Sequence, residues 1–568
     1  MDINDLGNVL ETDLLVIGGG LGGLFTAIKA KQNGVKNVLI VDKGAVSLSG
    51  QFTFAGGWII YLLPEDDLEE WLKAFFLGQQ GLCNQDMLES FLVRSTERLK
   101  DMEGMGLVHK RVPGGNSYLR MPSRGLHPVK MVYPPTYKDL EGGPAVMRAL
   151  RDEALRRGVE FCNKMFISDV IVQDNRIHGA VGCHRRTGDF HIFKSRAVVI
   201  AASDCSFRGN YACVEQTTGD AFAMAYHAGA DLTNMEFFVF NTGPLNFNFR
   251  GTGPVASMGA TFLNARDEDF MPKYHQEGSK AELNYIVQAM GQEVRKGHGP
   301  PFYYDFRPTP STMEESLFLS QGGWMARSLI RLKEKNTNVF DKKVEWIPVP
   351  MTLRGGLVTD INCMSNVQGL FAAGTAHSTG RGVFTGWSAG KCLWTGSTAS
   401  TFAAKYIECS ESERLDLDRI IHLKNRLYSR EIHPDTGAKT VNEITRMLQR
   451  IIFSFETSIL KSEDRLKRAL KDVDSIKENE LPKAKIPNLH EFIKFKELEN
   501  MFVTADLYLR ASLVRKESRG DHNREDYPDL DNRAWLKWIV LNKDLKEGHR
   551  LQNMPWEKYR YQPVDLDG

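Results

Sequence analysis

The chain has 568 residues, of which 42% are hydrophobic and 25% are charged, proportions that are ordinary for a folded protein. A chain of this length is expected to divide into several domains with sizeable cores. It carries 72 Lys and Arg against 71 Asp and Glu, so the formal net charge is +1. This balance argues against nucleic acid or an acidic membrane surface as the main partner.

Eight cysteines are scattered along the chain without a C-x-x-C pair. Structural zinc and iron–sulfur clusters need several thiolates close together, so we expect no metal site in the chain itself. Scattered cysteines in a large protein are usually buried, reduced thiols, which favours a cytoplasmic location. The start of the chain does not resemble a secretory signal, and the apolar runs are too short and glycine-rich to span a bilayer. We therefore expect no direct membrane insertion.

The first predicted element is a short buried strand followed by a glycine-rich turn. Residues 14–17 (LLVI) are wholly apolar, as in a strand that is buried on both faces of a parallel sheet. In the following GGGLGG, Gly18, Gly20 and Gly23 fill the pattern G-x-G-x-x-G. The three glycines permit a tight turn, a close approach to a pyrophosphate and close packing of helix on strand. Residues 24–34 then predict a helix whose N-terminus faces the phosphates.

A second strand and an acidic residue complete this pattern. Residues 38–41 (VLIV) read as the strand, and Asp42 ends it, 19 residues beyond Gly23. An acid at this spacing is expected to bind a ribose hydroxyl. A G-x-G-x-x-G motif alone is weak evidence, but here strand, helix and acid surround it. The pattern predicts a dinucleotide site, and the alternative is a chance glycine-rich turn.

Two later stretches favour FAD over NAD. Residues 197–202 (AVVIAA) read as another buried strand, which follows a hairpin-like region over 167–193. Far downstream, residues 369–374 (GLFAAG) resemble the late strand with which flavoproteins return to the sheet. The alternative reading of this last stretch is an ordinary core strand.

Several segments resemble the flavoprotein subunits of succinate dehydrogenase, fumarate reductase, L-aspartate oxidase and adenylylsulfate reductase. They are ETDLLVIGGGLGG, TTGDAFAMAYHAGADLTNMEF, VQGLFAAG and RKESRGDHNREDYP, and they occur in the family's order along most of the chain. The resemblance implies an α/β fold, with a Rossmann-type FAD-binding domain over 1–240 and 350–405. It also implies an inserted α+β capping domain over 241–349 and a C-terminal helical region with a docking tail over 408–568.

The chain departs from this family at the residues that carry its chemistry. Gly50 stands where the dehydrogenases attach FAD to a histidine, so we expect non-covalent FAD. The histidines and arginines that bind and protonate a C4 dicarboxylate in fumarate reductases are also replaced; their positions correspond to Asn241, Leu283, Met351 and the vicinity of Thr385. A dicarboxylate needs fixed cations and donors. These replacements therefore argue against fumarate reductase or succinate dehydrogenase activity.

The adenylylsulfate reductase alpha subunit is the closer branch in local sequence. Its glycine-proline segments resemble residues 251–255 (GTGPV) and 297–303 (GHGPPFY). That branch binds FAD non-covalently beside a ferredoxin-like subunit that holds the iron–sulfur clusters. The resemblance therefore implies such a partner for a chain without cluster cysteines, together with a small-molecule substrate.

Candidate site residues follow from the motifs and from the resemblance. For catalysis or substrate binding we select Arg381, His377, Arg354, Arg250 and Asn241. For the cofactor we select Gly18, Gly20, Gly23, Asp42, Lys43, Ser49, Gly56, Gly57, Ile167, Ala202, Asp220, Gly374, Thr375 and Ser388. His377 and Arg381 follow GLFAAG and are expected near the flavin, while Ser388 would begin a helix aimed at the ring. The ion-paired motif ESRGDHNRED is expected to be structural.

Three functions remain open at this point. The first is a catalytic flavoprotein subunit that exchanges electrons between a small organic or sulfur-containing substrate and a ferredoxin-like partner. The second is a self-contained flavin-dependent reductase of an activated C=C bond. The third is an electron-relay subunit without a small-molecule substrate.

Overall fold

The structure is a computed structural model that describes residues 2–123, 125–211, 214–245, 259–308, 334, 339–382, 384–411, 413–432 and 438–566. Its largest sheet has seven strands. In spatial order they are β8 (Glu160–Asn163), β2 (Val38–Asp42), β1 (Asn8–Ile17), β11 (Phe190–Ile200), β10 (Arg176–His184) and β9 (Met165–Gln173), with β18 (Leu370–Ala372) also paired to β11. The pairs from β8 to β11 and the β11–β18 pair are parallel, whereas β9, β10 and β11 are antiparallel.

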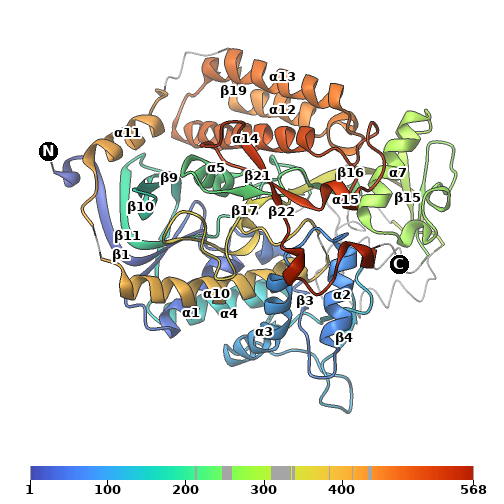
Figure 1. The fold of residues 1–568 in the computed structure, drawn as a ribbon, viewed down its shortest axis with the longest axis horizontal. Helices are drawn as coiled ribbons and strands as arrows, with labels where there is room; N and C mark the ends of the chain where they lie inside the picture. The colour runs from blue at the N-terminus through green and yellow to red at the C-terminus, as the bar shows by residue number, and fades with distance from the viewer. Residues whose placement is uncertain are drawn as a thin grey trace.

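Both faces of this sheet are covered, which explains its wholly apolar strands. On one face lie α1 (Leu21–Gln32), α4 (Gly143–Arg156) and α10 (Trp387–Cys409), as Figure 1 shows. On the other face lie α5 (Asp220–His227) and the C-terminal helices. The predicted α/β fold is thereby confirmed, including the return of GLFAAG to the sheet as β18.

A smaller aromatic-rich unit packs beside the N-terminal part of α10. It contains α2 (Leu68–Gly78) and α3 (Gln85–Gly104), which share a core with Trp387 and Trp394 of α10. Its short strands are β3 (Ile59–Ile60), β4 (Arg120–Pro122) and β5 (Lys130–Val132), while the strand pair β6 (Thr136–Tyr137) and β7 (Leu140–Glu141) packs against α4.

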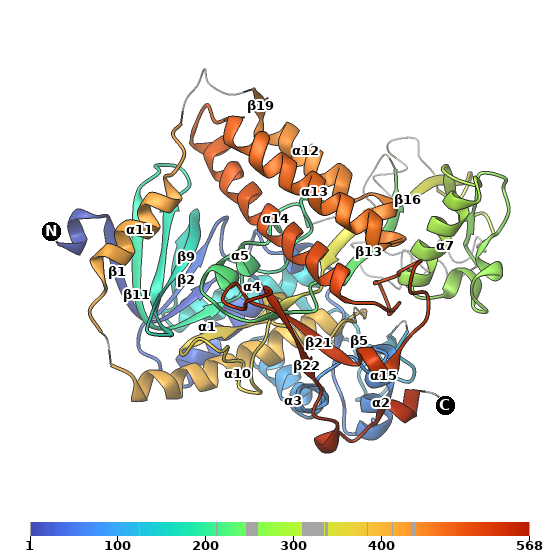
Figure 2. The same ribbon diagram turned by 45° about the horizontal axis from the view of Figure 1, so that its top comes forward.

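The inserted segment forms a separate α+β unit with its own core. Its antiparallel sheet has the order β13 (Phe238–Pro244), β16 (Val344–Leu353), β15 (Phe302–Asp305) and β14 (Thr261–Leu263), and α7 (Leu283–Arg295) packs beside it. Figure 2 shows this unit at one end of the molecule. Because β13 and β16 pair from Phe238–Leu353 onward, the boundaries expected near 241 and 349 fall inside paired strands.

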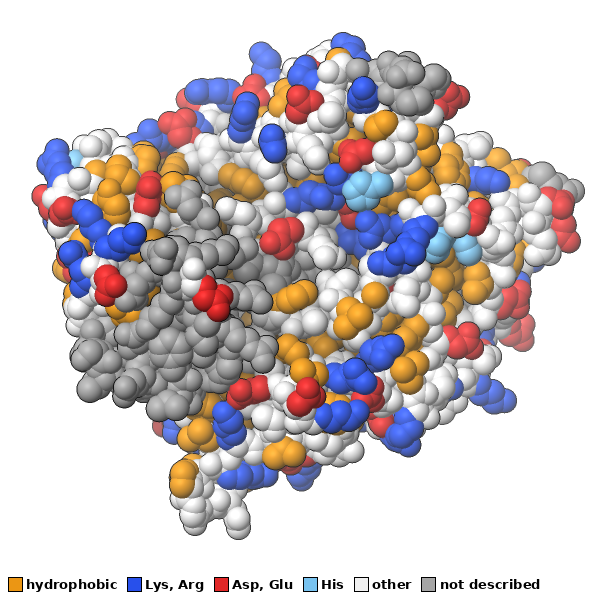
Figure 3. Space-filling model, turned by 180° about the vertical axis from the view of Figure 1, so that it is seen from behind, with side chains coloured by type: hydrophobic (Ala, Val, Ile, Leu, Met, Phe, Trp, Pro, Cys, Tyr) orange, Lys and Arg blue, Asp and Glu red, His pale blue; other side chains and the backbone are white. Residues whose placement is uncertain are grey.

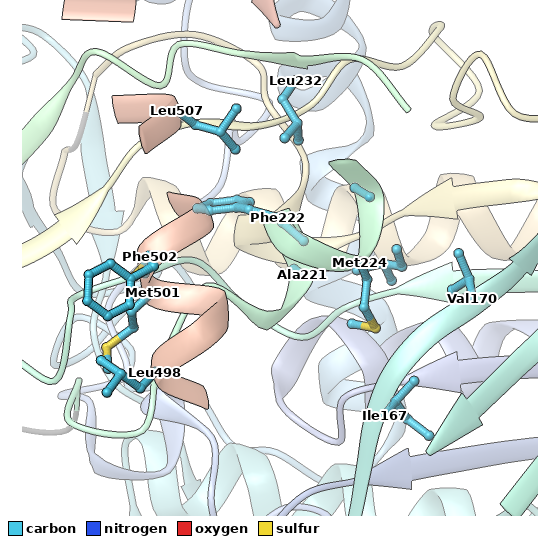
Figure 4. Packing of buried hydrophobic residues seen from close by; sticks show 14 of the residues in the cluster. Ile167, Val170, Ala221, Phe222, Met224, Leu232, Leu498, Met501, Phe502 and Leu507 are labelled. Carbon is cyan, nitrogen blue, oxygen red and sulfur yellow. The ribbon is translucent and has the colours of Figure 1, made fainter. Parts of the chain in front are cut away.

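The C-terminal region packs its long helices over α5. The helices are α11 (Leu417–Leu427), α12 (Val441–Ile452), α13 (Glu463–Asn479) and α14 (Leu489–Val514), with the short strands β19 (Lys439–Thr440) and β20 (Ala484–Lys485). Figure 4 shows Phe222 of α5 pointing toward α14, while Met224 of α5 points toward Ile167 and Val170 of β9. One apolar core therefore joins the C-terminal helices to the main sheet.

The C-terminal tail adds two strands to a small sheet. After α15 (Asn532–Trp535) it forms β21 (Lys537–Leu541) and β22 (His549–Asn553). These strands continue a sheet that includes β12 (Leu232–Thr233) and β17 (Gly356–Leu357). Backbone hydrogen bonds between β12 and β21 thus bind the tail to the FAD-binding domain.

Figure 3 shows acidic and basic side chains distributed together over the described part of one face, which agrees with the balanced net charge. No helix within the described ranges is both long and apolar enough to cross a membrane.

A buried ion cluster connects the FAD-binding domain to α14. The ammonium of Lys43 lies 2.7 Å from Asp220 and 2.9 Å from Glu497, and Arg208 also pairs with Glu497. Burial alone would raise the pKa of Glu497, but the charges of Lys43 and Arg208 lower it to about 2. The carboxylate therefore contributes most of its stabilisation in the charged form.

We expect Glu497→Gln to lower the melting temperature, because it leaves two cations without their shared acid, a loss of about 3–5 kcal/mol. The folded pKa is depressed, so this stabilisation is complete above the unfolded pKa of about 4.3. It is lost as the pH falls from there toward about 2. Thermal melts of both proteins should therefore differ most near neutral pH and converge in acid. The control is Glu463→Gln, whose exposed partner is Lys467, and equal melts of all three proteins would contradict the prediction.

Candidate functional site

A cavity of about 430 Å³ lies at the carboxyl ends of β1, β2 and β11. Its lining extends from the glycine-rich turn to β13 and β16 of the inserted unit and to the first turn of α10. Ligands of open α/β sheets bind at this edge of the strands. Of the predicted cofactor residues, all line the cavity except Gly23.

The glycine-rich turn has the geometry of a pyrophosphate-binding loop. Gly18 adopts a φ of +109°, and a Cβ at this position would lie 2.4 Å from the carbonyl oxygen of Ala201. Helix α1 begins at Leu21, so its free N–H groups face the cavity. Gly23 lies behind the loop, where a Cβ would be 1.8 Å from the carbonyl oxygen of Gly18. The loop therefore fits the phosphates of a dinucleotide such as FAD.

Asp42 lines the cavity and also holds the loop. Its carboxylate accepts hydrogen bonds from the amides of Gly19 and Gly44, both at 2.7 Å, and from the hydroxyl of Ser49 at 2.8 Å. A carboxylate offers about four acceptor sites, so one remains for a ribose hydroxyl. Sequence reasoning predicted the ribose contact and missed the positioning role.

The remaining cofactor candidates surround the same space. Lys43 and Asp220 enter it from the ion cluster described above. Thr375 lies 3.1 Å from Ser203 through their hydroxyl oxygens, and the amide of Gly374 donates to Thr395 at 2.9 Å. The other lining candidates are Gly18, Gly20, Ser49, Gly56, Gly57, Ile167 and Ala202. Ser388 is the second residue of α10, and Gly386 with φ +83° occupies the N-cap position instead.

The residues that line the cavity also bear on whether FAD could be attached covalently to a side chain. Gly50 lines the cavity, and a Cβ there would lie 3.0 Å from the Cα of Gly20. None of the lining residues within the described part of the chain is a histidine. Cys392 is present, but burial raises the pKa of its thiol to about 11, which leaves it a poor nucleophile.

Arg354 is the basic residue of the lining that lacks an acidic partner. Its side chain is buried, and its Nη1 makes only a long hydrogen bond, 3.4 Å, to the hydroxyl of Ser388. Its Nε has no hydrogen-bond partner, and no carboxylate of the described residues forms an ion pair with it. Burial lowers its pKa, and the charges of Asp204 and Asp521 oppose this. Arg354 is therefore suited to bind an anion in the cavity.

The four positions where the chain departs from the fumarate reductase pattern also line the cavity. They are Asn241, Leu283, Met351 and Thr385. Asn241 lies on β13, where its Oδ1 accepts from the amide of Thr242 at 2.7 Å and its Nδ2 lies 4.0 Å from the sulfur of Met351. Arg250 and residues 251–255 lie outside the described residues.

The structure places His377 outside the cavity lining. Its ring is fully buried, with Nε2 2.8 Å from the hydroxyl of Thr359 and its edge toward Trp394. Burial and the charge of Lys391 lower its pKa well below the usual value, so the imidazole is neutral. His377 lies outside the lining because a β-bridge between Leu357 and His377 fixes the backbone at this position. The structure therefore does not support the predicted contact of His377 with the flavin or with a substrate anion.

Arg381 is likewise buried but does not line the cavity. Its Nε and Nη2 donate to the carbonyl oxygens of Gln79 and Gly78, at 3.0 and 2.9 Å. It connects the segment between α2 and α3 to the C-terminal motif. This is a different place from the flavin-facing position expected for it.

Sequence reasoning missed one polar residue of the cavity lining, Asp204, and one buried residue that lies outside the lining, Lys391. Asp204 lines the cavity and accepts from the side chain of Gln51 at 3.1 Å. Its position just beyond the strand of residues 197–202 was a usable signal, because functional residues gather at the carboxyl ends of parallel strands. Lys391 is a buried residue of α10 and donates to the carbonyl of His377 at 2.6 Å. Burial and the charge of Arg354 lower its pKa to about 8.

The motif ESRGDHNRED forms a buried ionic network away from the lining. Arg515 pairs with Glu236 and Glu517, Arg519 pairs with Glu517, and Arg524 pairs with Asp526. These contacts are those of a structural segment. Within the described ranges, no three His, Cys, Asp or Glu side chains are grouped so as to hold a metal ion.

Comparison with known proteins gives matches over nearly the whole chain. The family model described as "FAD binding domain" matches residues 13–390, and that described as "Fumarate reductase flavoprotein C-term" matches residues 446–566. One subunit of the fumarate reductase (CoM/CoB) of Methanothermobacter marburgensis is 26% identical, over 94% of this chain and 98% of that protein.

Two solved structures share the fold at low identity. The FrdA chain of E. coli quinol fumarate reductase aligns with a TM-score of 0.85 at 20% identity, covering 98% of both chains. Adenylylsulfate reductase from Archaeoglobus fulgidus aligns with a TM-score of 0.78 at 21% identity, covering 97% of both chains.

We expect Gly23→Ala to abolish FAD binding while the rest of the fold persists, because the new methyl group would displace the loop at Gly18. The measurement is the ratio of flavin to protein absorbance after purification. Gly104→Ala is the matched control, since a Cβ at the end of α3 meets open space. A Gly23→Ala protein with a full complement of flavin would show that this loop does not hold the cofactor.

Proposed function

The chain belongs to the FAD-binding flavoprotein family of succinate dehydrogenase and fumarate reductase, and from this we propose that it is a catalytic flavoprotein subunit. In this proposal it exchanges electrons between a small organic or sulfur-containing anion and a ferredoxin-like iron–sulfur partner. The observation that carries the proposal is Arg354, a buried cation without an acidic partner that lines the cavity between the FAD-binding domain and the inserted unit. FAD would supply the two-electron chemistry, while the protein supplies binding and electrostatics.

A buried, poorly bonded guanidinium is costly unless a ligand completes its hydrogen bonds. Arg354 presents a planar fork that matches carboxylate, sulfonate or phosphate oxygens. It is flanked in the lining by the neutral donors Asn241, Thr352 and Thr385. A small anion with one charged group would complete the hydrogen bonds of Arg354. The uncharged part of the anion would then lie against the apolar side chains of the lining.

A C4 dicarboxylate suits this lining less well. The relative from Methanothermobacter marburgensis bears the name of a fumarate reductase, so membership of the family does not by itself exclude fumarate. However, Asn241, Leu283, Met351 and Thr385 supply no charge, and Lys43, the other cation of the described lining, is paired with Asp220 and Glu497. We infer that a second carboxylate would lack a cation.

The iron–sulfur partner is inferred from the path that electrons need. The described cysteines Cys83, Cys162, Cys183, Cys205, Cys363, Cys392 and Cys409 are free thiols that form no cluster site. Electrons therefore need an acceptor or donor outside this chain. Within the family resemblance, a ferredoxin-like subunit fills that role.

The first experiment is native co-purification with an absorbance spectrum, followed by acid precipitation. We expect flavin bands with a broad iron–sulfur contribution from a small partner, and yellow colour released into the supernatant, because Gly50 offers no attachment atom. Flavin without a partner would favour the self-contained reductase of an activated C=C bond. Colour retained in the pellet would contradict non-covalent binding.

We expect Arg354→Gln to retain FAD but to raise KM for the substrate anion about 100-fold, the effect of removing a charge-assisted bidentate contact. Arg354→Lys should recover part of this loss, since it restores the charge but not the fork. Steady-state kinetics with the substrate found by screening carboxylate, sulfonate and sulfur oxyanions provides the measurement, with fumarate expected to be inactive.

Arg510→Gln is the matched control for this prediction, because Arg510 lies on α14 with a partly exposed side chain that pairs with Asp506. An unchanged KM in Arg354→Gln, or an equal change in the control, would remove the central support for an anionic substrate.

A further inference from the structure

Two charged residues of the cavity lining stand opposite each other beside a β-bridge. Cys205 and Leu353 form this antiparallel bridge, and the amide of Leu353 donates to the carbonyl of Cys205 at 2.8 Å. Asp204 precedes Cys205 and Arg354 follows Leu353, so these two residues are the next opposite pair in the register. Opposite residues of an antiparallel pair have Cβ atoms about 5 Å apart. The backbone thus brings a carboxylate and a guanidinium together from segments that are remote in the sequence.

The surroundings of the four residues follow the alternation of side chains along paired strands. Cys205 and Leu353 both belong to the large apolar core. Asp204 and Arg354 instead both line the cavity, and their exposed fractions are only 2% and 9%. Both charges therefore lie inside the protein and border the same space.

The two charged groups do not satisfy each other. Oδ1 of Asp204 accepts from Nε2 of Gln51 at 3.1 Å and from the hydroxyl of Ser203 at 3.2 Å. Nη1 of Arg354 extends to the hydroxyl of Ser388 at 3.4 Å, and its Nε has no partner. Among the described residues, no hydrogen bond or ion pair joins Asp204 to Arg354, and Oδ2 of Asp204 has no hydrogen-bond partner. Each group therefore keeps hydrogen-bonding capacity for a ligand.

Several contacts within the FAD-binding domain fix the position of the Asp204 carboxylate. Gln51, which donates to it, also lines the cavity and follows the turn at Gly50. The hydroxyl of Ser203 lies 3.1 Å from that of Thr375, in the turn after β18. Because both side-chain donors act on Oδ1, Oδ2 is the oxygen whose acceptor sites remain open to a ligand.

A buried carboxylate or guanidinium with incomplete hydrogen bonding is costly. One ligand can complete both groups only if it brings an anionic group to Arg354 and a hydrogen-bond donor to Asp204. Since the two Cβ atoms are only about 5 Å apart, the donor must lie within one or two carbons of the anionic group.

We propose that Asp204 is a specificity-determining residue which, together with Arg354, selects small anions that bear a hydroxyl or ammonium group beside their anionic group. This inference rests on the proposed function, because it requires Arg354 to bind the substrate anion. It names the substrate class of that same site.

Ligands without such a donor are disfavoured for a physical reason. An alkyl group against Oδ2 of Asp204 would remove its remaining solvation without replacing the hydrogen bond. A second carboxylate at this position would be worse, because it would place a like charge beside Asp204. The same residue therefore rewards a donor and opposes a dicarboxylate.

The test compares propionate, lactate and alanine as ligands of the FAD-loaded protein. The three differ only in the substituent beside the carboxylate, which is hydrogen, hydroxyl or ammonium. Dissociation constants come from calorimetric titration without an electron acceptor, so that the measurement does not depend on turnover. We expect lactate and alanine to bind at least about tenfold more tightly than propionate, the effect of one hydrogen bond to a charged group. The tighter of the two identifies the preferred donor as hydroxyl or as ammonium.

Asp204→Asn removes the acceptor but keeps the shape of the side chain. Its amide oxygen would take the place of Oδ1 beside Gln51 and Ser203, so its NH₂ group would meet the donor of the ligand with another donor. The variant should bind propionate at least as tightly as before but lose the preference for lactate and alanine. Asp472→Asn is the control, because Asp472 is exposed on α13, and it should leave all three affinities unchanged.

A purely electrostatic role of Asp204 has a different signature. Its removal would then strengthen propionate and lactate binding equally and leave their affinity ratio unchanged, which would overturn the inference. Equal binding of the three ligands by the wild-type protein, or binding of none, would overturn it as well, and this comparison does not depend on the folding of any variant. The proposed function fails separately, if the purified protein carries no FAD or if Arg354→Gln leaves the binding of every anion unchanged.

Discussion

The site depends on how closely separate backbone segments approach one another around the glycine-rich turn. A Cβ at Gly22 would lie 3.2 Å from the backbone of Gly374, and one at Gly396 would lie 3.0 Å from the carbonyl of Gly22. These contacts bring α1, the turn after β18 and α10 together at one edge of the sheet. Every larger side chain there would separate the segments, so the helix N-terminus, the lining of the cavity and the position of α10 are fixed together.

Charge near the cavity follows a second constraint, because buried ions need partners. Lys43 satisfies it through Asp220 and Glu497, and Arg515 does so through Glu236 and Glu517. Among the described residues of the cavity lining, Arg354 is a cation that lacks such a pair. The ion pairs thus hold the domains together, and the residual field is available to a ligand.

The sequence was sufficient to predict the elements whose signal is local. Residues 14–42 carry strand, turn, helix and acid in unbroken order, and the structure has each of them. The sequence was insufficient to predict the direction of side chains, because that direction depends on contacts between segments that are distant along the chain. His377 follows a flavoprotein motif, yet its bridge to Leu357 and its contact with Thr359 fix it outside the cavity.

The incomplete pairing of Arg354 has a thermodynamic consequence for recognition. A fully paired arginine would make the empty protein more stable, but an incoming anion would then have to break that pair before binding. Asp204 lines the same cavity without forming an ion pair with Arg354, so its charge can lower the cost of burying the guanidinium without occupying the hydrogen-bond donors. Apart from the long bond of Nη1 to Ser388, the donors of the guanidinium then stay available to a ligand. The inserted unit and the FAD-binding domain each supply part of the lining around Arg354, so an anion would bind where the two units meet.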